Sequence, residues 1–151
     1  MEILQQSGLL DGVHTVVYVG GSLGHAIAEV VASNPHIQGI NFDLPHVVAA
    51  APAIHGVKHV GGSFFDSVPS RDALFLKFII HNYAEVIQIL KSCFKALPAK
   101  NGKLILAKFV YDKDKKSAKA RFLEYMDVLM VAVFKGARER SNEQYQMLLQ
   151  L

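Results

Sequence analysis

The residues that most clearly suggest chemistry are three glycines and an aspartate in the first third of the chain. Gly20, Gly21 and Gly24 follow an apolar run, and Asp43 ends a second apolar run after a helical pattern. In a parallel sheet this order brings a glycine turn and an acid to the carboxyl edge, where nucleosides bind. Glycines let a ligand approach the backbone, and a carboxylate can accept hydrogen bonds from both ribose hydroxyls. We therefore predict a site for a nucleotide-like cofactor.

The spacing of the glycines narrows the choice of cofactor. Ser22 and His25 stand where the G-x-G-x-x-G fingerprint of NAD-binding proteins needs its second and third glycines. No Gly-Lys-Ser/Thr follows the turn, so the P-loop pattern of triphosphate-binding proteins does not fit either. The looser turn from Gly20 to Gly24 is typical of class I methyltransferases, which bind S-adenosylmethionine (SAM). A tight strand-to-helix turn that binds no ligand is the alternative.

Alternating strands and helices are predicted to position these residues. Apolar segments predict strands at Thr15–Val19, Ile37–Phe42, Val57–Val60, Ala73–Ile80 and Lys103–Val110. Helical spacing or helix-start residues predict helices at Leu23–Ser33, Pro45–Ala51, Ala84–Leu97 and Ala118–Phe134, and a last helix capped by Ser141. This alternation indicates a single α/β domain with a doubly wound, mainly parallel sheet.

Composition agrees with one compact domain. The 151 residues are 51% hydrophobic, which is enough for one core, and the formal net charge is +3. Much of the basic excess lies in one polar stretch that also contains two aspartates, and we interpret it as a solvated loop; its basic residues are Lys113, Lys115, Lys116, Lys119 and Arg121. We therefore expect no nucleic-acid partner.

Cysteine, histidine and hydropathy patterns argue against a disulfide-bonded, a metal-binding or a membrane protein. The single cysteine, Cys93, excludes an internal disulfide and is expected as a packed thiol in a reducing compartment. The histidines show no metal-ligand spacing, so we expect no metal. Neither a long apolar run nor a leader pattern is visible, so we expect no membrane association and a cytoplasmic location.

Six phrases, spread in order over nearly the whole chain, carry a family resemblance: GINFDLPHVV, HVGGSFFDSVP, FLKFIIHNY, ILKSCFKALP, NGKLILAK and RERSNEQY. Together they resemble the cofactor-binding domain of the small-molecule SAM-dependent O-methyltransferases. That family includes plant caffeic acid and flavonoid, bacterial polyketide and animal hydroxyindole O-methyltransferases. The resemblance implies a class I, Rossmann-like methyltransferase fold and methyl transfer from SAM to a hydroxyl of a small aromatic acceptor.

The resemblance also implies which residues bind the cofactor. Positions that match Gly20 and Asp43 contact the methionine and ribose parts of SAM in the family. Those that match Ser63 and Phe64 flank the adenine, and the one that matches Lys77 lies beside the cofactor. These five residues are the cofactor-binding residues that the resemblance predicts.

His81 and Glu139 are the catalytic residues that the resemblance implies. The position of His81 is the general base in the family, and Glu139 matches one of the two acids that flank this base. A phenol titrates near pH 10 and an imidazole at about 6.5, so a neutral histidine can take the proton as the phenol oxygen attacks the sulfonium methyl. Holding the oxygen, the methyl carbon and the sulfur in line supplies much of the remaining acceleration.

Four departures from the family pattern remove negative charge. Tyr18, Ser63 and Asn82 replace acids of the pattern, and Lys108 replaces the second acid beside the histidine. Because SAM is a cation, the loss of carboxylates predicts weak SAM binding. A lysine facing the base would also disfavour the imidazolium that forms during transfer. We therefore expect methyl transfer to be weak or absent relative to typical family members.

The chain is shorter than the domain organisation of the family would require. Its members carry an N-terminal helical dimerisation domain and complete the sheet with an antiparallel pair. We expect residues 1–151 to form the SAM-binding domain alone, without the dimerisation domain and the last two strands. The resemblance implies a homodimer for full-length relatives. For this chain we expect a partner or self-association at an uncovered sheet edge.

Three functions therefore remain open from the sequence. The first is a SAM-dependent O-methyltransferase domain. The second is a catalytically decayed relative that serves as an interaction or regulatory module, which Tyr18, Ser63 and Lys108 favour. The third is a nucleotide-dependent oxidoreductase, which the glycine spacing disfavours.

Overall fold

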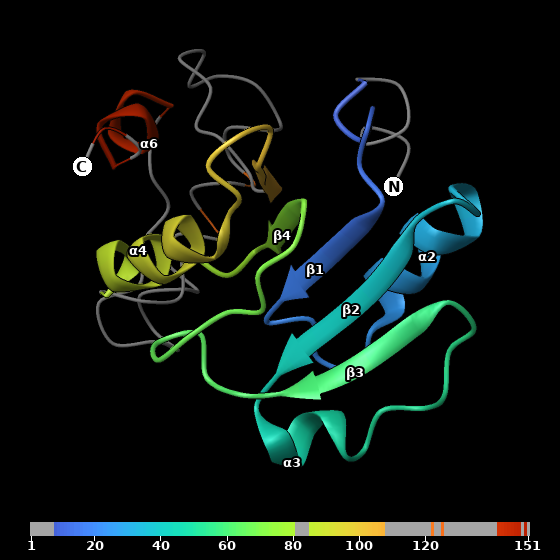
Figure 1. The fold of residues 1–151 in the computed structure, drawn as a ribbon. Coiled ribbons are helices and arrows are strands. Elements are labelled where there is room, and N and C mark those ends of the chain that lie inside the picture. Colours follow the sequence, from blue (N-terminus) through green and yellow to red (C-terminus); the bar gives the residue numbers. More distant parts are fainter. Residues whose placement is uncertain are drawn as a thin grey trace. The chain divides into compact units, whose positions relative to one another are not determined.

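A parallel sheet organises the fold of the computed structural model. It contains β1 (Thr15–Val19), β2 (Gln38–Asp43), β3 (Val57–Gly61), β4 (Ala73–Lys77) and β5 (Lys103–Ala107) in the order β3-β2-β1-β4-β5. Central β1 pairs in parallel with β2 and β4, and β2 pairs in parallel with β3 (Figure 1). The predicted α/β class with a parallel sheet is confirmed.

The structure describes residues 8–80, 85–107, 122, 125, 142–148 and 150. The chain divides into two compact units, one made of Met1–Lys77 with Lys91–Leu106 and the other of Phe78–Leu90 with Ala107–Leu151. The first unit contains the strands that carry the predicted cofactor residues. None of the helices in the described ranges is long and apolar enough to cross a membrane.

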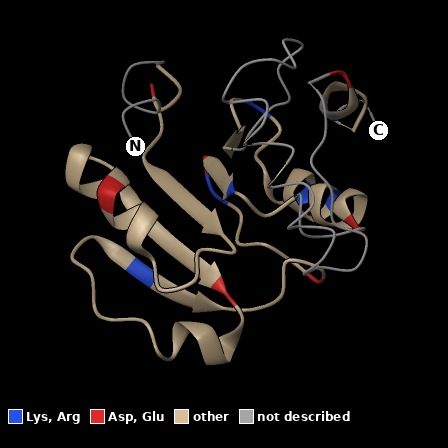
Figure 2. Ribbon diagram, turned by 180° about the vertical axis from the view of Figure 1, so that it is seen from behind, with Lys and Arg blue, Asp and Glu red and all other residues tan. Residues whose placement is uncertain are grey.

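Helix α2 (His25–Ser33) packs against one face of β2 and β3 and lies close to the strand backbone. It lies behind the strands in Figure 1 and in front of them in Figure 2, which views the molecule from the opposite side. A Cβ at Gly39 of β2 would lie 2.8 Å from Ile27 and 2.9 Å from Val31. The glycine therefore allows the close helix-to-sheet packing, and Val17 and Val19 of β1 are completely buried.

Most element boundaries follow the predictions, and two differences have clear backbone causes. Helix α2 begins at His25 and not at Leu23, because Gly24 adopts a left-handed conformation with φ 87°. Strand β4 ends at Lys77 and not at Ile80, because Phe78 has φ 55° and leaves the extended conformation.

Three further helices lie in the described residues. The predicted Pro45–Ala51 helix is shorter, with α3 at Pro45–Val48, and α4 occupies Val86–Ala96. Helix α6 spans Asn142–Leu148. The predicted Ala118–Phe134 helix lies almost wholly outside the described residues, as do Ser141 and the last residues of the predicted fifth strand.

Candidate cofactor site

The carboxyl ends of four neighbouring strands meet at one edge of the sheet. Gly20 follows β1, Asp43 ends β2, Ser63 comes two residues after β3, and Lys77 ends β4. The order β3-β2-β1-β4 makes these four positions neighbours along the edge, and Asp43 is the register partner of Gly61. Figure 2 shows the acidic end of β2 at this edge. The structure therefore brings these predicted cofactor residues to a common side of the sheet.

The glycine turn is tied to the end of β2. The backbone N–H groups of Gly20 and Gly21 both donate to the carbonyl of Phe42, at 2.8 and 3.2 Å. Gly20 has φ 70°, a left-handed conformation that only glycine adopts without strain. The turn closes with a 2.9 Å hydrogen bond from the Gly24 N–H to the Gly21 carbonyl. The turn is thus held beside the strand that carries the acid.

The carboxylate of Asp43 is oriented by two backbone groups. Oδ2 accepts a 2.7 Å hydrogen bond from the Ser22 N–H, and Oδ1 accepts one of 2.7 Å from the Leu44 N–H. A carboxylate has about four lone-pair sites, so each oxygen keeps capacity for a further donor. Asp43 is half-buried. A fixed carboxylate with one remaining acceptor site on each oxygen is suited to a vicinal diol such as ribose.

Tyr18 packs beneath the glycine turn. Its side chain is 8% exposed, and its ring stacks on that of Phe75 with centroids 5.0 Å apart and an interplanar angle of 28°. Its Cδ1 lies 2.7 Å from the position that a Gly21 Cβ would occupy. Burial, and then the charge of Asp43, raise the pKa of Tyr18 above its usual value of about 10. The phenol is therefore neutral at physiological pH and supplies no negative charge.

The segment after β3 forms a compact turn. The Ser63 Oγ accepts a 3.2 Å hydrogen bond from the Phe65 N–H, and its carbonyl accepts the N–H groups of Asp66 and Ser67. The Phe64 ring contacts the ring of Phe65, with centroids 4.8 Å apart. Ser63 and Phe64 are both half-buried. The turn therefore presents a hydroxyl and an aromatic ring from the strand next to β2.

Sequence reasoning missed Asn41, which lies at the centre of this region. It is completely buried, and its Nδ2 donates a 2.7 Å hydrogen bond to the Ser22 carbonyl. The available signal was an amide inside the apolar segment GINFD. Asn41 therefore helps to stabilise the glycine turn.

The predicted catalytic residues His81 and Glu139 lie outside the described residues, as do Asn82 and Lys108. Within the described ranges, no three His, Cys, Asp or Glu side chains gather in a way that could hold a metal ion.

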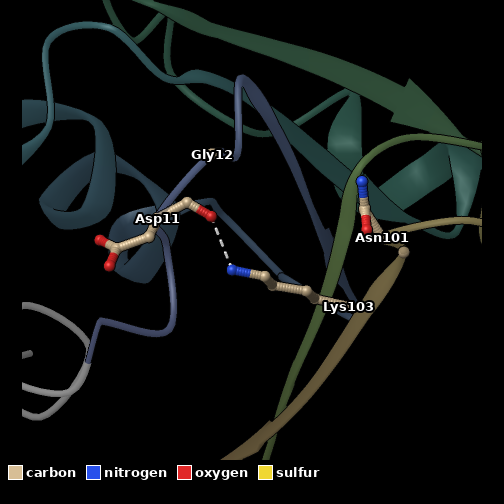
Figure 3. Close-up of a pocket in the computed structure, with 5 residues that line it drawn as sticks. Asp11, Gly12, Asn101 and Lys103 are labelled. Atoms are coloured by element: carbon tan, nitrogen blue, oxygen red, sulfur yellow. Dashed lines mark hydrogen bonds between the residues drawn. The ribbon is translucent and has the colours of Figure 1, made fainter.

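Two cavities among the described residues lie at the opposite, amino edge of the sheet. One, of about 290 Å³, is lined by Asp11, Gly12, Asn101, Gly102 and Lys103 (Figure 3). The Lys103 ammonium donates to the carbonyls of Leu9 and Asp11 at 3.0 and 2.7 Å. The other cavity, of about 470 Å³, includes the first residues of β1, β2 and β3. Lys103 thus anchors the segment before β1 to β5, a structural role.

The strand order β3-β2-β1-β4-β5 is that of a Rossmann-like methyltransferase fold. The sequence profile of the O-methyltransferase domain family matches residues 1–151. The chain belongs to this O-methyltransferase family, as its sequence motifs predicted.

Several characterised proteins are similar to the chain. It is 43% identical over 137 residues to naringenin 7-O-methyltransferase of Oryza sativa subsp. japonica, and covers 36% of that protein with 89% of its own length. It is 43% identical over 150 residues to caffeic acid 3-O-methyltransferase 2 of Ocimum basilicum, with 97% of the chain matching 41% of that protein. The chain thus spans about two fifths of the length of these relatives.

Solved structures agree with the fold. CalO1, a methyltransferase in calicheamicin biosynthesis solved in its S-adenosylhomocysteine-bound form, superposes with a TM-score of 0.85 at 28% identity, covering 98% of this chain and 45% of CalO1. Human N-acetylserotonin methyltransferase in complex with SAM superposes with a TM-score of 0.83 at 21% identity, covering 99% and 46% of the two chains. The second likeness shows the fold alone.

Proposed function

We propose that this chain is the cofactor-binding domain of a SAM-dependent O-methyltransferase that acts on a hydroxyl of a small aromatic acceptor. The observation that carries the proposal is the Asp43 carboxylate, which two backbone N–H groups hold beside a glycine turn at the carboxyl edge of a parallel sheet. Membership of the O-methyltransferase family supports the reaction class. Relatives named for flavonoid and caffeic acid substrates support the acceptor class.

The residues at the edge fit an adenosyl ligand. The remaining lone pairs of the two Asp43 oxygens would accept the two ribose hydroxyls. Ser63 and Phe64, on the neighbouring turn after β3, would flank the adenine, where an aromatic ring can pack against the base. Gly20, after β1, would contact the methionine part, and Lys77, at the end of β4, would lie beside the cofactor. When bound, SAM supplies an activated methyl group on a sulfonium.

His81 is proposed as the general base and Glu139 as the acid that orients it. These roles come from the family motif, and His81 follows the end of β4 by four residues, since β4 ends at Lys77. A neutral imidazole would accept the proton of the acceptor hydroxyl, and a carboxylate would stabilise the resulting imidazolium.

A specific observation favours the second candidate, a methyltransferase-fold module with weakened or lost catalysis. Tyr18 occupies a position where the family motif has an acid, and its phenol is neutral and packed against Phe75. At this position the site has no charge with which to attract a cationic cofactor. This module would keep the fold and bind uncharged adenosyl ligands better than SAM.

The remaining parts of the proposal concern the protein as a whole. We propose that residues 1–151 form one SAM-binding domain that works with a helical dimerisation domain, and that the complete enzyme is a homodimer. The proposed partner is a small hydroxylated aromatic substrate. We propose no nucleic-acid or membrane partner. The lone, buried Cys93 supports a reducing, cytoplasmic location.

Transfer of radiolabelled methyl groups from SAM to a panel of phenols tests the proposed activity. Labelled product that disappears in His81→Ala and persists in His36→Ala, an exposed histidine before β2, would support the reaction and its base. Transfer at an equal rate in both variants would remove His81 from the mechanism. Binding of S-adenosylhomocysteine without any transfer would favour the decayed module.

A further inference from the structure

Asn41 is the one side chain among the described residues that is both polar and fully buried. Burying an amide is unfavourable unless its polar atoms find hydrogen-bond partners. Sheet register explains its surroundings, because Tyr18 of β1 and His59 of β3 are the direct partners of Asn41. The three side chains form a row across the sheet below the glycine turn.

Both protons of the Asn41 amide have acceptors. Nδ2 lies 2.7 Å from the Ser22 carbonyl oxygen and 3.1 Å from Nδ1 of His59. The other ring nitrogen of His59, Nε2, lies 2.9 Å from the Pro52 carbonyl oxygen. Because a carbonyl only accepts, Nε2 carries the imidazole proton and Nδ1 offers a lone pair to Asn41. A flipped amide would place Oδ1 against the Ser22 carbonyl, so this network fixes both the amide orientation and the tautomer.

Ser22 is the strained residue that this network holds. Its φ of 52° is uncommon for a residue with a side chain, and such a conformation persists only where neighbouring groups stabilise it. Its N–H donates to Asp43 Oδ2, and its carbonyl accepts from Asn41 Nδ2, both at 2.7 Å. Two side chains of β2 therefore fix the two polar backbone groups of Ser22.

Because Gly21 and Gly24 have no side chains, Asn41 and His59 can lie directly against the turn. A Cβ at Gly21 would lie 2.0 Å from Asn41 Oδ1, the one buried side-chain oxygen in the described residues without a hydrogen-bond partner. A Cβ at Gly24 would lie 3.2 Å from His59 Cε1 and 3.3 Å from Asn41 Cγ. Asn41 and His59 thus pack directly against the turn.

We propose that Asn41 and His59 are positioning residues for the nucleoside site: they hold Ser22 in its left-handed conformation, and Ser22 in turn orients the Asp43 carboxylate. The link to nucleoside binding rests on the proposed function. The link to the conformation of Ser22 does not, because every contact in it lies within the protein.

Variants of His59 test both links. His59→Leu removes the acceptor for Asn41 and puts an apolar side chain in its place, whereas His59→Gln keeps one acceptor and one donor. His55→Leu makes the same change at an exposed histidine of the preceding turn and serves as the control. The measurements are amide hydrogen exchange at Ser22, the ¹⁵N shifts of the His59 ring, and the Kd for S-adenosylhomocysteine.

We expect wild-type His59 to show a protonated Nε2 and an unprotonated Nδ1. His59→Leu should speed exchange at Ser22 and weaken S-adenosylhomocysteine binding about five- to tenfold, the effect of one lost hydrogen bond. His59→Gln should restore part of both, and His55→Leu should match wild type.

A protonated Nδ1, or unchanged exchange at Ser22 in His59→Leu, would overturn the positioning role. The ring shifts of the wild-type protein decide this even where a variant fails to fold. Faster amide exchange at Ser22 with an unchanged Kd for S-adenosylhomocysteine would refute the proposed effect on ligand binding. A wild-type protein that binds no S-adenosylhomocysteine would refute the proposed function, and the exchange and tautomer results would still decide the role of the pair on Ser22.

Discussion

Replacing Asp43 with asparagine tests the nucleoside site while changing the fewest atoms. In the wild-type protein each carboxylate oxygen accepts a 2.7 Å hydrogen bond from a backbone N–H, one from Ser22 and one from Leu44. An amide has only one oxygen, so in Asp43→Asn one N–H would face an NH₂ group. The loss of one hydrogen bond to a charged acceptor should lower the free energy of unfolding by about 2 kcal/mol.

Ligand affinity should fall as well. The variant loses one charged acceptor for a ribose hydroxyl, worth about 2 kcal/mol, which corresponds to about a 30-fold weaker Kd for S-adenosylhomocysteine. Calorimetric titration measures the affinity, and urea denaturation measures the stability. Because both are measured on the same protein, a loss of binding can be separated from a loss of folded protein.

Asp72→Asn is the matched control. Asp72 Oδ2 accepts the backbone N–H groups of His14 and Thr15 at 3.0 and 2.9 Å, at the amino edge of the sheet. The change removes the same charge, yet a single amide oxygen can keep both hydrogen bonds. Affinity in Asp72→Asn should therefore equal that of wild type. Equal affinity in Asp43→Asn and wild type would refute the assignment of the carboxylate to the ligand.

Three further predictions concern the packing of Gly21 and Tyr18 at the glycine turn and of Cys93 in α4. Gly21→Ala should lower the free energy of unfolding by about 1–3 kcal/mol and weaken ligand binding, because the new Cβ would overlap Asn41. In Gly12→Ala the new Cβ meets no atom within 4 Å, but the φ of 71° strains any side chain, so this control should lose some stability and keep ligand binding intact. Tyr18 has a raised pKa, so the stability that its neutral form contributes should be lost as pH rises above about 10. Chemical denaturation from pH 8 to 11 should therefore show a smaller fall in the free energy of unfolding for Tyr18→Phe than for the wild-type protein. An equal fall in the two proteins would contradict this. Burial raises the pKa of Cys93 to about 12, so iodoacetamide at pH 8 should label the native thiol far more slowly than the urea-unfolded one; rapid labelling of the native protein would disprove its burial.

The elements of the sheet could be predicted because their signals are local. The mostly apolar segments of β1 and β2 indicate strands buried on both faces, and an acid at the end of such a segment marks the carboxyl edge. Boundaries were less predictable, because they depend on single backbone conformations. The left-handed φ of Phe78, which ends β4, has no signal in an apolar sequence.

The side chains that pack below the glycine turn come together through the register of the strands, which cannot be predicted from the sequence alone. Asn41 forms hydrogen bonds with Ser22, 19 positions earlier in the chain, and with His59, 18 positions later. These contacts exist because β2 pairs in parallel with β1 and β3 in a register that brings the three segments together. The sequence carries no sign of this role for His59, since the histidines show no metal-ligand spacing. Tyr18 stands where the family pattern has an acid, and its stacking on Phe75 likewise requires the pairing of β1 with β4.

A crystal structure of the chain with S-adenosylhomocysteine would show whether Asp43 binds the ribose. We predict that the two ribose hydroxyls lie about 2.5–2.9 Å from the two oxygens of Asp43, with the adenine beside the turn that carries Ser63 and Phe64. A ligand bound elsewhere, or a glycine turn closed by the Tyr18 side chain with no nucleoside at the edge, would contradict it.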